Sequence, residues 1–197
     1  MDGYDPMHRV RALCTFEGRQ PHMHRLQGGE QIEMSQKPDI SALCKRAESL
    51  LRKEKYPEAL DCCEEILQSE PKNLEVIKHK GYALGNLDRH EEALQCFNAI
   101  LELDPNNFDA LYFKAQELHY LKNYSESLGF YDRALAIDKN DIASLKGKAR
   151  VFKEIGKYEQ AKISCEKALD INPKDSDALF IRNAAIDLLG KNWGAYR

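Results

Sequence analysis

The sequence lacks any run of 18 apolar residues, so it predicts no helix that spans a membrane. Its N-terminus also lacks the continuous apolar core of a signal peptide. Positive charge is not in excess either, because the formal net charge of the 197 residues is -3, which disfavours a nucleic-acid-binding protein. These absences favour a cytoplasmic protein whose partner is neither a membrane nor a nucleic acid.

The motifs of common enzyme classes are absent as well. The sequence contains no Gly-rich phosphate loop, no Ser nucleophile elbow and no pair of His residues flanking a Glu on a helix. The six Cys residues have no paired metal-ligand spacing, and Cys62 and Cys63 are adjacent rather than arranged as C-x-x-C. His22 and His24 have no further ligands at a suitable spacing. We therefore expect no catalytic residue, no cofactor, no metal site and reduced thiols.

A period of 34 residues is the dominant feature of the sequence. Residues of similar size recur at this spacing in columns. The columns are large aliphatic (Leu43, Ile77, Leu111, Leu145, Leu179), small (Ala47, Gly81, Ala115, Ala149), large again (Leu50, Leu84, Leu118, Phe152, Ile186), small again (Ala59, Ala93, Ser127, Ala161), and aromatic or Cys (Cys63, Phe97, Tyr131, Cys165). Three units close with a Pro, at Pro71, Pro105 and Pro173, and Lys139 takes the fourth place.

Each unit of the period predicts a pair of antiparallel helices. Ile77 and Gly81 share one face of a first helix, and Ala93 and Phe97 share one face of a second. Gly81 and Ala93 are small where the two helices approach each other, and the ring of Phe97 fills the space beside them. Pro105 ends the second helix, because proline cannot continue a helix and restricts the residue before it.

This pattern resembles the tetratricopeptide repeat. The marks of that family appear most completely in one unit, at Gly81, Leu84, Ala93, Phe97 and Pro105. The signature Trp of the family is replaced by aliphatic residues such as Ile77 and Leu111. The resemblance covers residues 40–189 and implies an all-α fold. That fold is a helical-hairpin solenoid, a right-handed superhelix whose first helices line a concave groove.

The period divides the chain into four units and a last helix. The units are residues 40–73, 74–107, 108–141 and 142–175, and segment 176–197 holds the last helix and a tail. Asn183 stands where other units have Ala or Gly, so close packing of a second helix is not required, and we expect a capping helix. We expect this helix to run from Ser176 to Leu189, to end at Gly190, and to be followed by a tail in which Trp193 packs on the cap.

The first 33 residues differ from the rest of the chain. They show no helical period and contain four Arg but no Lys, a composition that predicts a disordered leader, followed by a linker at 34–39. The residues QGGE can be encoded by codons that contain a ribosome-binding sequence, four codons before Met34. One hypothesis is that Met34 is the physiological start and that residues 1–33 are translated upstream sequence. The alternative is a genuine flexible N-terminal arm.

The groove implied by the resemblance suits a peptide or a helix of another protein. We predict a protein-interaction module with an adaptor or scaffold role; the alternative is a self-assembling structural protein that uses the groove or the capping helix. The predicted groove residues are Lys78, His79, Tyr82, Tyr112, Phe113, Gln116, His119, Tyr120, Lys146, Arg150 and Lys153. Because Lys146, Arg150 and Lys153 form a basic stripe at i, i+4 and i+7, we expect acidic as well as apolar residues in the partner. The alternative is a solvated basic face that is neutralised by Glu154, Asp109 and Asp177. His90 occupies the place of Tyr56, Tyr124 and Tyr158 in other units, so we expect it to pack at a turn.

One subclass of the family can be tested on the residues themselves. Some tetratricopeptide domains bind the acidic C-termini of cytosolic chaperones through a carboxylate clamp of Lys, Asn and Arg. In one phase the clamp positions of this sequence hold Cys44, Glu48, His79, Asp109 and Phe113, and in the next phase they hold Lys78, Tyr82, Phe113, Ala143 and Gly147. Only Lys78 fits, so we do not expect a chaperone C-terminus as the partner.

Overall fold

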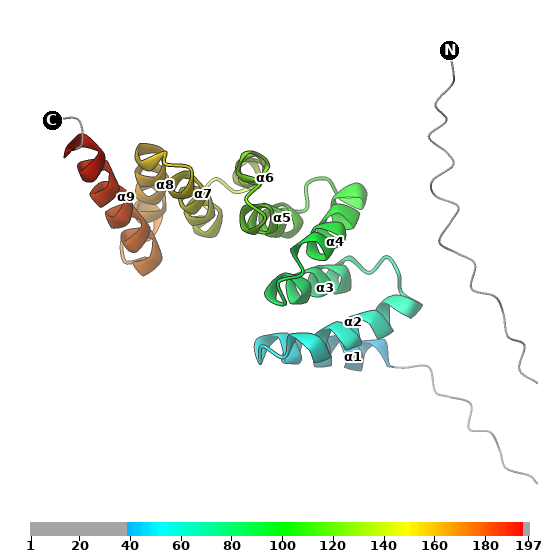
Figure 1. Cartoon of the computed structure of the whole chain (residues 1–197). Coiled ribbons are helices and arrows are strands. Elements are labelled where there is room, and N and C mark those ends of the chain that lie inside the picture. The colour runs from blue at the N-terminus through cyan, green and yellow to red at the C-terminus, as the bar shows by residue number, and fades with distance from the viewer. Residues whose placement is uncertain (1–38, 195–197) are drawn as a thin grey trace, which may run out of the picture. The chain divides into compact units, whose positions relative to one another are not determined.

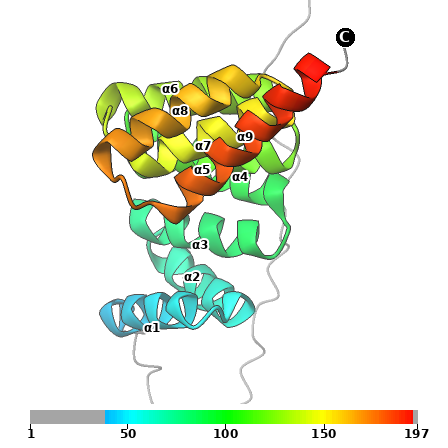
Figure 2. The ribbon, with the colours of Figure 1, turned by 90° about the vertical axis from the view of Figure 1, so that its left-hand side faces the viewer.

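The computed structural model describes residues 39–194, and within that range it contains nine helices and no strand (Figure 1). The helices are α1 (Ile40–Arg52), α2 (Tyr56–Ser69), α3 (Leu74–Asn86), α4 (His90–Leu103), α5 (Phe108–Tyr120), α6 (Tyr124–Ile137), α7 (Ile142–Glu154), α8 (Tyr158–Ile171) and α9 (Ser176–Gly194). Each helix packs against the next one in the chain (Figures 1 and 2). This part of the chain is therefore an all-α helical-repeat solenoid, as the period predicts. The predictions for residues 1–33, for Met34 and for Trp193 fall outside the described side chains.

Each first helix of a hairpin begins at a side chain that caps its first turn. Asp39, Asn73, Asn107 and Asp141 each accept a hydrogen bond from the backbone N–H three residues later. Asp175 does the same for α9, where the N–H of the residue three places on donates at 2.8 Å. These residue types are the preferred N-caps, and here they recur every 34 residues. The recurring cap fixes where each first helix starts.

The turn inside each hairpin places one residue in the left-handed conformation. The φ angles are 58° at Glu54, 58° at Asp88, 61° at Lys122 and 75° at Gly156. Only the last of these is a glycine, the residue type that adopts this conformation without steric cost. The four positions are 34 residues apart, so the turn geometry repeats although the residue type does not.

The small columns lie where the two helices of a hairpin touch. A Cβ atom built on Gly81 would lie 2.8 Å from Cζ of Phe97 and 3.1 Å from Cβ of Cys96. Phe97 itself is completely buried. The cluster around it also includes Leu60 from the preceding hairpin and Ala110 from the following one. The core therefore continues from unit to unit, which is how a repeat array without a central core gains stability.

The first helices form the concave surface of the array. Each first helix contacts the next first helix, from α1 and α3 to α7 and α9, whereas α2, α4, α6 and α8 make no such contacts among the described helices. Successive first helices are therefore closer together than successive second helices. The array must therefore curve toward the side of the first helices. The faces of the first helices that point away from the second helices line the concave surface.

The last helix is longer than predicted. Gly190 lies inside α9, which continues to Gly194, so the expected end at Gly190 is wrong. Glycine ends a helix when it adopts a positive φ angle, and among the described glycines only Gly156 does so. Asn183 is exposed, and the side chain of Ile186 is 43% exposed. Both observations fit a face of α9 that no second helix covers within the described residues.

Candidate functional site

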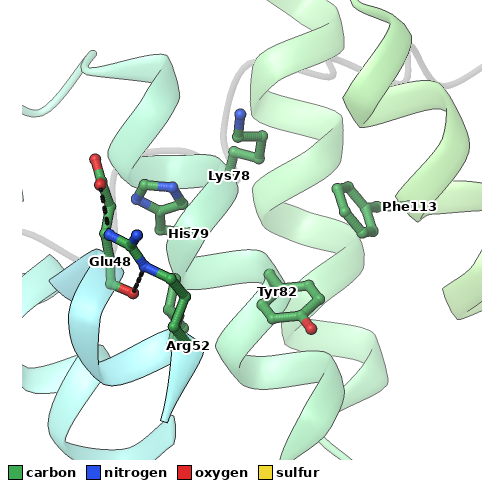
Figure 3. A pocket seen from close by; sticks show the side chains of 7 residues that line it. Glu48, Arg52, Lys78, His79, Tyr82 and Phe113 are labelled. Atoms are coloured by element: carbon green, nitrogen blue, oxygen red, sulfur yellow. Dashed lines mark hydrogen bonds and ion pairs between the residues drawn. The ribbon is translucent and has the colours of Figure 1, made fainter. Parts of the chain in front are cut away.

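The concave surface contains a hollow between α1, α3 and α5 with a volume of about 350 Å³ (Figure 3). This first hollow is lined by Glu48, Leu51, Arg52, Lys78, His79, Tyr82 and Phe113. Arg52 donates to the Glu48 carboxylate at 3.4 Å, and Lys78 donates to Asp109 on α5 at 3.0 Å. The first hollow therefore combines aromatic rings with charges that are already paired.

A second hollow, of about 330 Å³, lies beside the first one, between α3, the start of α4 and α5. It is lined by Tyr82, Gly85, Asn86, Asp88, His90, Phe113, Gln116, Glu117 and Tyr120. Tyr82 and Phe113 belong to both hollows and form the wall between them. The lining of the second hollow includes two carboxylates and no Lys or Arg.

Glu117 and His90 form a partly enclosed pair in the second hollow. Glu117 is only 6% exposed, and its Oε2 lies 2.7 Å from Nδ1 of His90. Burial raises the pKa of Glu117, while the hydrogen bond to His90 opposes that rise. The other ring nitrogen of His90 lies 3.8 Å from Asp88, and the ring stacks on Tyr120 with centroids 5.0 Å apart. His90 therefore packs at a turn, as the repeat column indicates, and it also holds a buried carboxylate.

An unbroken line of aromatic rings crosses the hairpins. It runs from Tyr56 to Tyr82, Phe113, Tyr112 and Tyr131, with successive centroids 6.3, 5.6, 5.3 and 6.1 Å apart. All four contacts are edge-on, an arrangement that aromatic pairs favour. The line connects the groove rings to the buried ring of Tyr131. The groove rings are therefore held in place by packing before any ligand binds.

The basic stripe on α7 is largely paired with carboxylates. Lys146 lies 3.1 Å from Asp175 and 3.3 Å from Asp177, which also lies 3.5 Å from Arg150. Lys153 lies 3.8 Å from a neighbouring glutamate of its own helix. The stripe therefore offers much less free positive charge than its sequence indicates, because residues about 30 positions further along the chain neutralise most of it.

The predicted groove residues fall into three groups: those that line a hollow, those that lie beside the hollows and those that do neither. Lys78, His79, Tyr82 and Phe113 line the first hollow, and Tyr82, Phe113, Gln116 and Tyr120 line the second. Tyr112 and His119 are half-buried beside them, where burial raises the pKa of the Tyr112 phenol and lowers that of the His119 imidazole. Lys146, Arg150 and Lys153 line neither hollow.

Several lining residues are absent from the sequence-based prediction. Glu48, Leu51 and Arg52 come from the first unit, where the prediction named no residue. The sequence could have pointed to Glu117, because it is a charged residue in a column of small or apolar ones. The equivalent residues in other units are Ser49, Ala83, Val151 and Ala185, of which the last three are buried and apolar. Phe180, which lines neither hollow, shares the column of Lys78, Tyr112 and Lys146 and is 72% exposed.

The described thiols are all unpaired. Cys44, Cys62, Cys63, Cys96 and Cys165 form no disulfide. Burial raises the pKa of Cys63 to about 12 and that of Cys165 to about 11. Thiols with raised pKa values react slowly, since the thiolate is the nucleophile.

The described helices also contain none that is long and apolar enough to cross a membrane.

Comparison with protein families places this geometry in a known class. Residues 52–134 match the family model described as anaphase-promoting complex, cyclosome, subunit 3, and residues 147–175 match the model of the tetratricopeptide repeat. The four hairpins and the matched models show that the chain belongs to the tetratricopeptide repeat proteins. No curated protein matches the sequence significantly.

Solved structures resemble the fold at low sequence identity. MamA (residues 41 to the end) from Desulfovibrio magneticus RS-1 is 23% identical, with a TM-score of 0.64 over 79% of this chain and 94% of that one. TTC0263, a tetratricopeptide protein of Thermus thermophilus, is 19% identical, with a TM-score of 0.67 over 76% of this chain and 82% of that one. YrrB, described as a tetratricopeptide protein with an unusual peptide-binding site, is 18% identical, with a TM-score of 0.60 over 75% of this chain and 76% of that one. At these identities the likeness establishes the fold alone.

Proposed function

We propose that this chain is a non-catalytic protein-interaction module that binds a peptide segment or a helix of a partner protein on its concave surface, in an adaptor or scaffold role. The observation that carries the proposal is the exposure of aromatic rings at the two hollows. Tyr82 is 37% exposed and Tyr120 is 65% exposed. Aromatic residues dominate the binding energy of many protein interfaces, and rings held by packing lose little conformational entropy when they bind.

The shape of the surface supports an extended ligand. The two hollows are adjacent and share a wall, so a single segment can contact both. Five first helices follow one another along this face, which suits recognition of an extended or helical segment better than a small molecule. YrrB, which shares the fold, is described as having a peptide-binding site.

The chemistry of the partner follows from which groups on the surface are unpaired. The aromatic rings of Tyr82, Phe113 and Tyr120 favour apolar or aromatic side chains in the ligand. The cations of the α7 stripe are paired with Asp175, Asp177 and Glu154, so they give weaker support for acidic residues in the ligand than the sequence did. The principal binding residues that we propose line the two hollows or lie directly beside them: Lys78, His79, Tyr82, Tyr112, Phe113, Gln116, His119 and Tyr120.

Selection from a displayed library of short random peptides tests the proposal on the full chain. Selected peptides should bind the Tyr120→Ala variant at least about tenfold more weakly, or about 1.4 kcal/mol. The control is Ile163→Ala on the second helix α8, where the removed side chain is 44% exposed and lies outside both hollows. Equal losses in the two variants, or no enriched peptide at all, would refute binding on the concave surface.

Self-assembly through the last helix is the second candidate. The observation that favours it is the exposure of Phe180 and Ile186 on α9, at the end of the array where no further hairpin is described. Exposed apolar side chains on this last helix can meet a second copy of the chain. Light scattering combined with size-exclusion chromatography tests this: a monomer at every concentration contradicts it, and a dimer that Phe180→Ser dissociates supports it.

A further inference from the structure

We infer that the second hollow is a recognition pocket for a basic side chain, Lys or Arg, carried by the bound peptide. This inference rests on the proposed function, because it assigns one side chain of the ligand to one position on the concave surface. It differs from the sequence-based expectation of an acidic partner, since it depends on a carboxylate that the sequence analysis did not single out.

The carboxylate of Glu117 is the first observation that carries the inference. Its side chain is 8% exposed, and His90 occupies only Oε2, at 2.7 Å. No hydrogen bond reaches Oε1 among the described residues. The Oε1 atom itself is not sealed from the hollow, because among the described residues only Oγ of Ser144 is fully buried without a partner. It can therefore accept a hydrogen bond from a donor that enters the hollow.

Gly85 is the second observation, because its missing side chain leaves the space that the carboxylate of Glu117 occupies. A Cβ atom built on Gly85 would lie 2.5 Å from Oε1 of Glu117 and 3.0 Å from Cδ. Gly85 lies in α3 with an ordinary φ angle, so the backbone itself does not require glycine. Its absent side chain instead gives Glu117 the space to lie at the lining of the second hollow.

The remaining lining of the hollow suits a cation. Asp88 adds a second carboxylate at the rim, where its side chain is 97% exposed. Tyr82, Phe113 and Tyr120 add aromatic rings, a kind of group that attracts a Lys ammonium or an Arg guanidinium. No Lys or Arg lines the hollow to compete.

The two hollows differ in the charge that they present. The first hollow includes Arg52 and Lys78, so it is less suited to a cation than the second. A segment that lies across both would therefore place a basic residue over Glu117 and an apolar residue between α1 and α3. Because Glu117 is partly enclosed, its attraction for the cation should persist at a salt concentration that screens exposed pairs.

The test combines a change in the ligand with a change in the protein. Peptides selected on the full wild-type chain are synthesised with each Lys replaced by norleucine and each Arg by citrulline. Both replacements remove the charge; citrulline keeps the length of Arg, and norleucine is one heavy atom shorter than Lys. Binding is measured by fluorescence anisotropy to wild type, to Glu117→Gln and to Glu91→Gln. The last variant removes the same charge at an exposed position of α4 that lines neither hollow.

We expect one basic residue in the selected peptides to be essential. Its replacement should weaken binding to wild type by at least about tenfold and should have little further effect on Glu117→Gln. Glu91→Gln should behave as wild type toward the same pair of peptides. Thermal melts of Glu117→Gln serve to confirm that the variant is folded, and the peptide replacements on wild type need no variant at all.

The two possible failures are distinguishable. If no peptide is enriched on the concave surface, both the proposed function and this inference are refuted. If peptides are enriched but contain no essential basic residue, or if the replacement weakens binding equally in wild type and Glu117→Gln, the basic pocket is refuted while the interaction module stands.

Discussion

Replacing Gly81 with alanine tests the packing that holds each hairpin together. The added Cβ would lie 2.8 and 2.9 Å from two atoms of the Phe97 ring and 3.1 Å from Cβ of Cys96. Phe97 is completely buried and stacks on Phe113 with centroids 5.6 Å apart, so its ring cannot move without disturbing a second one. Overpacking of this kind costs about 1–3 kcal/mol, and we expect the upper part of that range.

A gain in helix propensity opposes this loss. Alanine is about 1 kcal/mol more favourable than glycine inside a helix, and Gly81 lies in the interior of α3. The expected net effect of Gly81→Ala is therefore a loss of about 1–2 kcal/mol in the free energy of unfolding. For an array of this size, that corresponds to a fall in melting temperature of about 2–8 °C.

Gly129→Ala is the matched control, because it makes the same chemical change where nothing is close. Gly129 lies inside α6, and no atom lies within 4 Å of a Cβ built on it. Here only the propensity gain remains, so we expect stability to rise by up to about 1 kcal/mol. Thermal melts followed by circular dichroism compare the two variants with wild type. A rise in melting temperature for both would refute the close approach at Gly81.

Three further predictions follow from features of the array. Gly156→Ala should destabilise the protein by about 1 kcal/mol, because the φ angle of 75° is strained for alanine, and urea denaturation should show a lower midpoint. Asn107→Ala should cost about 1 kcal/mol by removing the cap of α5, and Asn107→Asp should retain most of the stability in the same assay. Burial lowers the pKa values of His79 and His119, so the unfolded chain binds their protons more readily. The stability that these two groups contribute is present above about pH 6.5 and is lost as the pH falls below that value. The urea midpoint of the double variant His79→Gln, His119→Gln should therefore change less than that of wild type as the pH falls below about 6.5.

The sequence predicted the fold well because the 34-residue period reports local packing. The small residue at Gly81 and the ring of Phe97 can be read together, since both belong to one hairpin and each has equivalents in other units. The faces of the first helices that were expected in the groove came from the family resemblance, and their binding role stays a prediction.

Interactions between units were harder to predict. Lys146 was expected in a basic stripe that Asp177 or Glu154 could neutralise. Its partner Asp175, which is 29 residues away and caps the following helix, was not foreseen. Glu117 meets His90 across 27 residues, and neither residue has an equivalent of the same type in another unit. Such pairs depend on how neighbouring hairpins are rotated against each other, which a column of similar residues does not specify. The extension of α9 was missed for a different reason, because Gly190 permits a helix end without requiring one.

The wall shared by the two hollows has a consequence for the spacing of side chains in a ligand. Tyr82 and Phe113 contact each other edge-on with centroids 5.6 Å apart, so the wall has a fixed thickness. A segment that fills both hollows must cross this ridge, with one side chain on each side of it. Residues i and i+2 of an extended strand are about 7 Å apart, whereas residues i and i+4 of a helix are about 6 Å apart along the axis. The ridge therefore selects ligands by the separation between two anchoring residues, in addition to the chemistry of those residues.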